Sequence, residues 1–367
     1  MNRDYMEQAL ALAREGIGQT SPNPAVGALI VRGGEVVGRG CHTWAGVKHA
    51  EILALEEAGE RARGATLYVT LEPCSHQGRT GPCTEAVIAA GISKVVAAMQ
   101  DPNPLVGGDG FRRLRAAGIE VGITSSHTAA VERLNEAFVH FMLCRRPLVT
   151  LKAALTLDGK IAAPDDNQGW ITSELARAHV QEVRHASDAI LTGIGTVLGD
   201  DCLMTDRSGK PRSRPLLRIV LDSQLRLPAS SRMVNSCRDD VLVVTTSAAS
   251  EERRAVLESR GVKVLVCDGP SGRTDPRGVV DFLAREQYLS LMIEAGSKVN
   301  WAVLESGIVD KIFFYYAPKI LGGMQSLPVA GGAGRRRRVD AIRFQNVQLH
   351  RIAPDEFAVE AYMVKEP

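Results

Sequence analysis

Three residues that bind soft metal ions, together with one carboxylate, stand out between positions 49 and 83 of the sequence. His49 precedes Glu51 by two positions, Cys74 follows a proline, and Cys83 follows another proline. An imidazole and two thiolates are common zinc ligands, and three protein ligands leave one coordination position open. Zinc in such an open site lowers the pKa of bound water to about 7. The pattern therefore predicts a catalytic zinc site held by His49, Cys74 and Cys83.

Glu51 is then available to move protons instead of binding the metal. We expect it to take a proton from water and to deliver it to a leaving amine. A His-x-Glu followed by Pro-Cys and a second Cys is the layout of zinc deaminases that act on amino-bearing nucleobases. Cys83 is expected to ionise readily, because helix N-termini lower the pKa of thiols. The alternative is a closed structural zinc site, in which His42 or His76 would supply a fourth ligand.

The elements that position these residues alternate between helices and strands. Gly33-Gly34 between two short apolar runs predicts a hairpin. Helices are predicted at 4–15, 49–59, 82–90, 108–117 and 128–142, and strands at 28–31, 35–38, 66–70, 94–99 and 119–123. This alternation predicts an α/β domain of three layers, with the zinc ligands at helix starts and after a strand.

A second set of elements follows Cys144-Arg145-Arg146-Pro147, and we predict domains at 1–145 and 146–367. Strands are predicted at 148–152, 188–192, 216–221, 241–245, 263–266, 289–294 and 311–316, and helices at 174–186 and 298–306. The tail at 341–364 alternates apolar and polar residues, which predicts an antiparallel edge. Gly193-Ile194-Gly195 after a strand allows close approach of a phosphate, although the third glycine of a dinucleotide motif falls one place late.

Composition limits the classes of function. The chain has 367 residues, 45% hydrophobic and 23% charged, as expected for a soluble globular protein of two domains. A formal net charge of +2 gives no reason to expect nucleic acid as a partner. The sequence has no apolar run long enough for a membrane span and no signal-peptide stretch, so we expect no membrane partner. Seven scattered cysteines suit the reducing cytoplasm better than a disulfide framework.

The loop from Pro73 to Cys83 resembles that of the bifunctional riboflavin-biosynthesis deaminase/reductase family, in which Pro-Cys-x-His-x-Gly-Arg-Thr-x-Pro-Cys is typical. Pro22-Asn23-Pro24 and Asp101-Pro102-Asn103-Pro104 also match, and Gly81 replaces the usual proline. The resemblance implies a cytidine-deaminase-like three-layer domain. It also implies that a pocket for the pyrimidine and its ribose phosphate is lined by Asn23, His42, Ser75, His76, Arg79, Thr80, Asp101 and Asn103.

The second half resembles the reductase half of the same family. The matching residues include Leu157-Asp158-Gly159, Trp170-Ile171-Thr172, Thr205-x-Arg207 and Glu294-x-Gly296. The resemblance implies a dihydrofolate-reductase-like fold that uses NADPH. It places Ala154, Trp170, Thr196, Asp200, Ser223 and Gly296 at the cofactor, and Lys152, Gln168, Arg184, Met204, Arg207 and Glu294 at the sugar phosphate. Cys202 replaces the family's proline, Met204 replaces its leucine, and Gln168 replaces a smaller polar residue.

These features imply two consecutive reactions. The first is zinc-dependent hydrolytic deamination of 2,5-diamino-6-ribosylamino-4(3H)-pyrimidinone 5′-phosphate. The second is NADPH-dependent reduction of the ribosyl group to ribityl, which gives 5-amino-6-ribitylaminouracil 5′-phosphate. We expect a cytoplasmic homo-oligomer that binds this small molecule.

Two alternatives remain at this point. One is a zinc deaminase of another nucleobase or nucleoside with a decayed or unrelated second domain, and the other is a non-enzymatic zinc-stabilised binding module. The glycine-rich run 331–334 and the arginines at 335–338 predict a solvated loop, with phosphate contact as the alternative.

Overall fold

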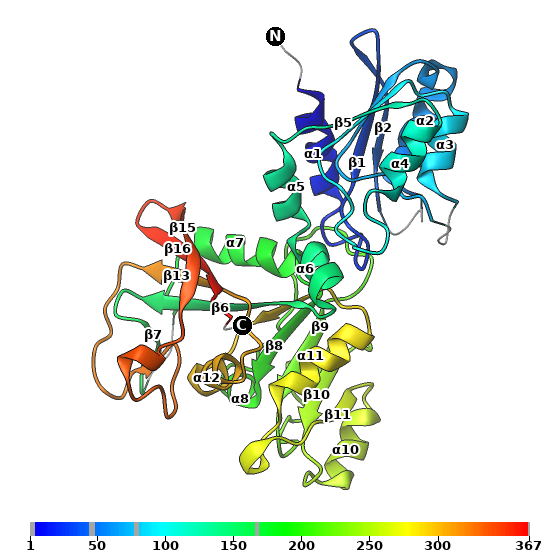
Figure 1. The fold of residues 1–367 in the computed structure, drawn as a ribbon. Coiled ribbons are helices and arrows are strands. Elements are labelled where there is room, and N and C mark those ends of the chain that lie inside the picture. The colour runs from blue at the N-terminus through cyan, green and yellow to red at the C-terminus, as the bar shows by residue number, and fades with distance from the viewer. Residues whose placement is uncertain (1–3, 44–47, 77–80, 166–168, 366–367) are drawn as a thin grey trace. The chain divides into compact units, whose positions relative to one another are not determined.

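The computed structural model describes residues 4–43, 48–76, 81–165 and 169–365. By its contacts the chain forms two compact units (Figure 1). Unit 1 comprises residues 1–145 together with 211–214, and unit 2 comprises residues 146–210 and 215–367. The short segment 211–214 joins unit 1 through a bond of 3.2 Å from the Ser213 amide to the Gly18 carbonyl.

Unit 1 is built on a five-stranded sheet of order β2-β1-β3-β4-β5. The strands are β1 (Gly27–Arg32), β2 (Glu35–Cys41), β3 (Thr66–Val69), β4 (Lys94–Ala97) and β5 (Glu120–Ile123). β1 is antiparallel to β2 and β3, whereas β3, β4 and β5 are parallel. Gly33 and Gly34 have φ values of 58° and 84°, so the hairpin turn uses the left-handed backbone that glycine adopts without strain.

Helices cover both faces of this sheet, which confirms the three-layer expectation. They are α1 (Tyr5–Glu15), α2 (Ala50–Ala58), α3 (Cys83–Ala89), α4 (Asp109–Ala116), α5 (Thr128–Leu134) and α6 (Glu136–Cys144). α1 and α5 lie on one side of the sheet, and α2, α3 and α4 lie on the other (Figure 1). A Cβ added at Gly40 would stand 1.9 Å from the Ala50 carbonyl oxygen. Glycine in β2 therefore lets α2, which carries Glu51, lie directly on the sheet.

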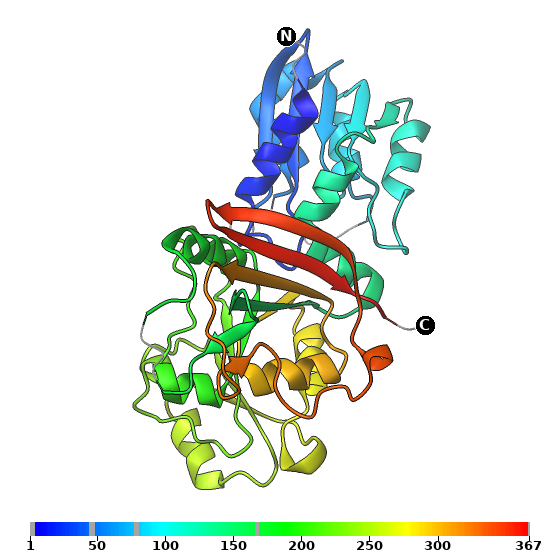
Figure 2. The ribbon, with the colours of Figure 1, turned by 90° about the vertical axis from the view of Figure 1, so that its left-hand side faces the viewer.

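Unit 2 contains a nine-stranded sheet of order β11-β10-β9-β8-β12-β6-β13-β16-β15. Its strands are β6 (Leu148–Thr156), β8 (Ala189–Gly193), β9 (Leu217–Leu221), β10 (Val241–Thr245), β11 (Lys263–Val266), β12 (Ser290–Ile293), β13 (Lys311–Ala317), β15 (Phe344–Ala353) and β16 (Glu356–Met363). The strands from β11 to β13 are parallel to their neighbours, and β16 and β15 add an antiparallel edge. Figure 2 shows this last pair as two long arrows, and it confirms the edge predicted for the tail.

Apolar side chains fill both faces of the larger sheet. Valines and leucines of α11 (Pro276–Arg285) and α12 (Ser297–Glu305) form one core with the strands. α8 (Ile194–Asp200), α9 (Arg232–Asn235) and α10 (Glu251–Glu258) pack on the other face, and α7 (Glu174–His185) covers its β13 end. A short pair, β7 (Lys160–Ala162) and β14 (Leu327–Pro328), forms a separate ladder. In the described part of the chain, no helix has the length and apolar character that crossing a membrane requires.

The structure corrects several of the predicted elements. The helix predicted at 128–142 breaks at Asn135, whose side chain is engaged elsewhere. Its Oδ1 accepts from the Ala25 amide at 2.7 Å, and its Nδ2 donates to the Ala25 carbonyl at 3.0 Å. The prediction also lacks α9, α10 and α11, although Ser250 caps α10 and Asp275 precedes a proline at the start of α11. Ser231 likewise caps α9, so cap residues could have indicated all three helices.

Candidate active sites

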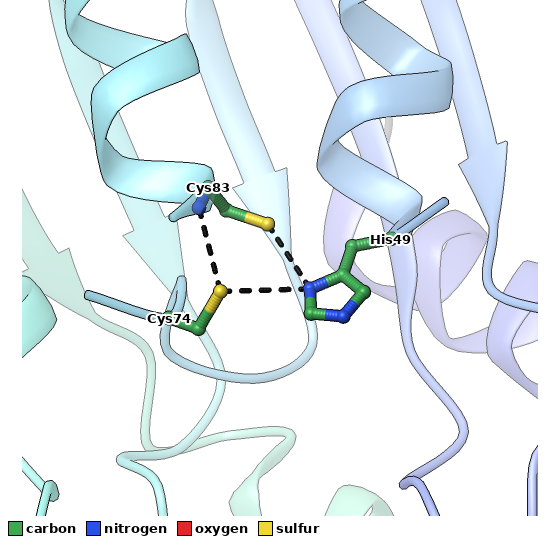
Figure 3. A group of neighbouring side chains, drawn as sticks. All are labelled: His49, Cys74 and Cys83. Atoms are coloured by element: carbon green, nitrogen blue, oxygen red, sulfur yellow. Dashed lines mark hydrogen bonds between the residues drawn. The ribbon is translucent and has the colours of Figure 1, made fainter. Parts of the chain in front are cut away.

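The three predicted metal ligands meet at one point in unit 1 (Figure 3). His49 Nδ1 lies 3.1 Å from Cys83 Sγ and 3.5 Å from Cys74 Sγ, and all three ligand atoms lie within 4.8 Å of one another. Bonds of about 2.0–2.3 Å to one zinc ion place tetrahedral ligand atoms at about such separations. Two sulfurs and one imidazole nitrogen in this arrangement fit zinc.

Each ligand is positioned by the start of a helix or the end of a strand. His49 is the N-cap of α2, and Cys83 is the first residue of α3 after Pro82. Cys74 lies in the loop that follows β3, and its sulfur accepts a bond of 3.4 Å from the Cys83 amide. The first turn of α3 thus holds one ligand by its side chain and another by its backbone.

The two thiols differ in a way that the sequence analysis did not predict. Hydrogen bonds from the Cys83 thiol and, to a smaller extent, from the His49 ring lower the pKa of the Cys74 thiol to about 4. The same contact, together with burial, raises the pKa of Cys83. Within this pair the proton stays on Cys83, and the expectation that Cys83 ionises when it binds zinc remains a prediction.

Glu51 lies in the first turn of α2, next to His49, and it is only 3% exposed. Burial raises its pKa to about 7, with the His49 ring opposing the shift and Cys74 adding to it. A carboxyl group that exchanges its proton near neutral pH is suited to general acid and base catalysis.

His42 supports the site without joining the ligand group. Its Nε2 lies 3.1 Å from Asn23 Nδ2, and its Nδ1 lies 2.8 Å from the Lys48 carbonyl oxygen. Both ring nitrogens are thereby engaged, and burial lowers the pKa of the ring. The alternative of a fourth ligand from His42 is not supported, and His76 is exposed at the surface. Among the described residues the metal-binding group has three members, which leaves a position open.

A hollow beside Cys74 brings together several of the predicted substrate residues. Its lining includes Ser75, His76 and Asp101. Asp101 Oδ1 accepts from the Asn103 amide at 2.8 Å, so Asn103 belongs to the same loop. Burial raises the pKa of Asp101, and the negative charges of Glu72 and Cys74 add to the shift. Arg79 and Thr80 lie outside the described residues.

Two residues that the sequence analysis missed hold these loops. Glu72 is a buried carboxylate before Pro73, and it lines the same hollow. Asn135 holds the backbone of Ala25, two positions after Asn23. For Glu72 the only sequence signal is its place directly before Pro-Cys, and for Asn135 there is none, because its partner lies 110 positions away.

In unit 2 three of the predicted residues form a buried ionic cluster at neighbouring strands. Glu294, after β12, accepts from Lys152 Nζ of β6 at 2.9 Å and from Arg184 Nη2 of α7 at 2.8 Å. Burial alone would raise the pKa of Glu294, but the two cations hold it at about 2. β8, β12 and β6 are parallel, so the carboxyl ends of β8 and β12 lie at the same edge of the sheet. The cluster therefore lies near the turns at Gly193, which ends β8, and at Gly296, which follows β12.

The loop that departs from the family pattern is firmly held in spite of Cys202. Arg184 Nη1 donates to the Thr205 carbonyl at 3.0 Å, and the buried Arg218 donates to the Leu203 carbonyl at 3.1 Å. Met204 is buried with a φ of 53°. These bonds supply rigidity that the missing proline would otherwise give, and Arg207 remains exposed at the end of the loop.

The predicted cofactor residues fall into two groups. Thr196 in α8 and Gly296 at the N-cap of α12 are adjacent, because a Cβ added at Gly296 would lie 3.8 Å from Thr196 Oγ1. Ala154 is in the neighbouring β6. Trp170 instead lies under the Arg177 guanidinium, and Ser223 accepts from the Thr274 amide at 3.2 Å. Asp200 is exposed at the end of α8, and Gln168 lies outside the described residues.

Two family models match the chain. Residues 1–99 match the "Cytidine and deoxycytidylate deaminase zinc-binding region", which contains the three metal ligands. Residues 147–356 match the "RibD C-terminal domain", which contains the ionic cluster. The two matches together cover most of the sequence.

Relatives match along almost the whole length. The riboflavin biosynthesis protein RibD of Actinobacillus pleuropneumoniae is 42% identical over 93% of this chain and 90% of its own length. RibD of Acinetobacter baumannii has a TM-score of 0.86 at 36% identity, with 98% of each chain covered. The diaminohydroxyphosphoribosylaminopyrimidine deaminase/5-amino-6-(5-phosphoribosylamino)uracil reductase of Thermotoga maritima has a TM-score of 0.81 at 34% identity, with 98% of each chain covered. Since both halves match in sequence and in structure, the chain belongs to the RibD family of riboflavin-biosynthesis proteins.

Proposed function

We propose that the chain deaminates 2,5-diamino-6-ribosylamino-4(3H)-pyrimidinone 5′-phosphate and then reduces the ribosyl group of the product to ribityl. The RibD family and the deaminase and reductase named for the Thermotoga maritima relative support both reactions. The observation that carries the first reaction is the three-ligand group beside a buried Glu51. This geometry also favours an enzyme over a structural zinc module, which would use a fourth ligand.

In the first reaction, each residue of unit 1 has a distinct task. When bound, zinc would supply a Lewis acid that makes water nucleophilic near neutral pH. His49, Cys74 and Cys83 would hold the ion. Glu51, with a pKa of about 7, would carry two protons in turn: one from the water to the ring nitrogen, and one from the hydroxyl added to the ring to the departing amine.

The pyrimidine and its phosphate are proposed to contact the surrounding loops. Asn23, held by His42, presents an amide to a ring edge, and Ser75, His76 and Asp101 line the hollow beside Cys74. Asn103, whose amide is bound by Asp101, is proposed to contact the substrate from the same loop. From the sequence, Arg79 and Thr80 are proposed to bind the phosphate, since a guanidinium forms paired bonds to phosphate oxygens.

In the second reaction, unit 2 is proposed to bind NADPH at the strand ends near α12. NADPH would supply the hydride. Ser297 Oγ is buried at the N-terminus of α12 and has no hydrogen-bond partner in the described part of the chain. An unsatisfied hydroxyl at a helix N-terminus fits a phosphate group. A Cβ at Gly331 would stand 2.5 Å from this oxygen, so the glycine-rich run borders the same place.

The ionic cluster is proposed to hold the sugar phosphate. Lys152 and Glu294 present a cation and a carboxylate to ribose hydroxyls, and Arg184 fixes Glu294 and the Thr205 carbonyl. Arg207, which is exposed at the end of the same loop, is proposed to bind the phosphate. Met204 and Gln168 are proposed to complete this pocket, and positioning supplies most of the catalysis.

Removing zinc should separate the two activities. Treatment of the purified protein with a strong chelator is expected to lower ammonia release from the diaminopyrimidine phosphate more than 100-fold, and added zinc should restore it. NADPH oxidation with the deaminated product as substrate should stay unchanged, because the proposed reductase site does not use a metal ion. Deamination that survives complete loss of zinc would contradict the proposed mechanism.

We also propose that the protein works in the cytoplasm as a homo-oligomer. All seven cysteines are free, which suits a reducing compartment. β15 is an edge strand, and its Val347 and Leu349 are 61% and 71% exposed. On the same end of the sheet, Tyr316 stacks on the partly exposed Phe357. Exposed apolar groups on a sheet edge favour association with a second copy.

Charging this edge should dissociate the oligomer. Leu349→Asp is expected to reduce the mass measured by sedimentation to that of one chain, because a carboxylate would have to be buried in the interface. Val256→Asp on α10 is the matched control, since Val256 is 47% exposed but lies away from β15. A monomeric wild-type chain, or an oligomer that survives Leu349→Asp, would show that β15 is not the interface.

A further inference from the structure

Glu72 is a buried carboxylate directly before Pro73 and Cys74, and the proposed reaction does not use it chemically. The residue is 5% exposed. Its Oε2 accepts from the Asp101 amide at 3.1 Å and from the Gly108 amide at 2.9 Å, and its Oε1 accepts from the Phe111 amide at 3.1 Å. Three charge-assisted bonds offset the cost of burying the carboxylate. Both carboxylate oxygens of Glu72 therefore bind the backbone between Asp101 and Phe111.

The helix α4 depends on this carboxylate for its cap. Its N-cap residue is Gly108, with a φ of 88° and no side chain that could accept a helix amide. A side-chain oxygen normally accepts the amide of the third helical residue, and here Glu72 accepts it from Phe111. Negative charge at a helix N-terminus is also favourable. Glu72 thus caps α4 from a loop 36 positions earlier in the chain.

At Gly110, α4 lies so close to the Cys74 loop that a side chain would not fit. A Cβ at Gly110 would stand 2.1 Å from the Pro73 carbonyl oxygen and 3.0 Å from Glu72 Oε1. Such distances would force the helix away from the loop. The Glu72 carboxylate and the absence of a side chain at Gly110 therefore both contribute to the close approach of α4 to the ligand-bearing loop.

The segment that Glu72 holds carries two of the proposed substrate residues. Residues 98–108 contain neither helix nor strand, and Glu72 Oε2 binds this segment at Asp101 and again at Gly108. Between these points, Asp101 accepts from the Asn103 amide, and Asn103 Oδ1 accepts from the Leu105 amide at 3.2 Å. A backbone bond of 3.0 Å from the Glu72 amide to the Met99 carbonyl holds the start of the segment, and the Glu72 carboxylate holds the part that carries Asp101 and Asn103.

We propose that Glu72 is a positioning residue for the deaminase reaction, which sets the distance between the Cys74 loop and the substrate-binding side chains of Asp101 and Asn103. This inference rests on the proposed deaminase function. Glu72 acts on substrate binding through Asp101, without contact to the reacting atoms and without holding the metal.

The test uses the full chain and the variants Glu72→Gln, Asp101→Asn and the double variant. Glutamine retains one acceptor oxygen, but its NH₂ group would face at least one of the backbone N–H groups that Glu72 binds. Two donors cannot form a hydrogen bond, so the segment from Asp101 to Gly108 should shift. We expect kcat/KM for deamination to fall roughly 10–100-fold in Glu72→Gln, mainly through KM, with one zinc per chain. In a protein that already carries Asp101→Asn, adding Glu72→Gln should lower kcat/KM for deamination by less than about 3-fold, because the effects of coupled residues are not additive. Glu120→Gln, on the exposed end of β5, serves as the control.

Gly110→Ala gives a second and independent perturbation, because it moves α4 while the carboxylate remains. Like Glu72→Gln, it is expected to raise KM for deamination, and it should leave NADPH oxidation unchanged. Additive losses in the double variant, an unchanged KM, or a loss of zinc from Glu72→Gln would each overturn the inference. A wild-type chain without deaminase activity would defeat the proposed function itself, whereas an active wild type with an unaffected Glu72→Gln defeats this inference alone.

Discussion

Glu51→Gln is expected to lower the rate of deamination by about 10³-fold or more while zinc remains bound. Glutamine has almost the same shape as glutamate, but it cannot accept and return a proton. The carboxyl group is buried with a pKa of about 7, so the wild-type protein has both of its protonation states available near neutral pH. General acid and base catalysis contributes about 10²–10⁴-fold, and here one group serves both steps.

Zinc analysis and ammonia release on one preparation measure this effect. Glu57→Gln, farther along α2 and exposed, is the matched control and should retain wild-type activity. NADPH oxidation by both variants should equal that of the wild type, which shows that unit 2 is intact. If Glu51→Gln deaminates at the wild-type rate, then Glu51 is not the proton carrier and the three-ligand group serves another purpose.

Glu294→Gln should have the largest effect in unit 2, on stability and on reduction together. The change leaves Lys152 and Arg184 in a buried site with side chains only 7% and 9% exposed. Removing one partner of a buried ion pair costs about 3–5 kcal/mol of unfolding free energy, and we expect about 3 because the Glu294 side chain is 23% exposed. We also expect a loss of more than about 100-fold in kcat/KM for reduction, because the cluster then no longer holds its geometry.

The urea concentration at which reductase activity is lost measures the stability of unit 2. Ammonia release by the same preparation shows whether unit 1 is still active. Glu305→Gln, exposed on α12, is the control. The carboxyl pKa is lowered from 4.5 to about 2, so its stabilising contribution is present above pH 4.5 and is lost as the pH falls toward 2. The difference between the two proteins should therefore be full at pH 7 and should shrink in acid. An equally stable and equally active variant would mean that the cluster has no role in either property.

The zinc site could be predicted from residue types because its chemistry is local. His49 and Cys83 begin helices, and Cys74 follows a strand, so the sequence pattern already brings the ligands to one edge of the sheet. The strands from β1 to β6 and from β8 to β13 were predicted to within a few residues for the same reason, since apolar runs bounded by glycine or proline determine them, whereas β7 and β14 were not predicted. Unit 2 gave no comparable chemical signal, and its candidate residues came from the family resemblance alone.

What could not be predicted depends on contacts between distant residues. The break at Asn135 follows from bonds to Ala25, and nothing near position 135 signals it. The bond from the Cys83 amide to the Cys74 sulfur joins residues nine positions apart, and the residue types alone do not reveal it. Glu72 resembles an ordinary loop residue in the sequence, and its partners lie at Asp101, Gly108 and Phe111.

The bonds between Asn135 and Ala25 have a consequence for the order of events during synthesis. The strands and helices that carry the metal ligands all precede residue 99, which is also the extent of the zinc-binding family match. The Ala25 backbone receives its partner only after another 110 residues have left the ribosome. All three metal ligands are therefore synthesised before the residue that holds the turn beside Asn23, and a fragment ending at 99 would contain the ligands without Asn135.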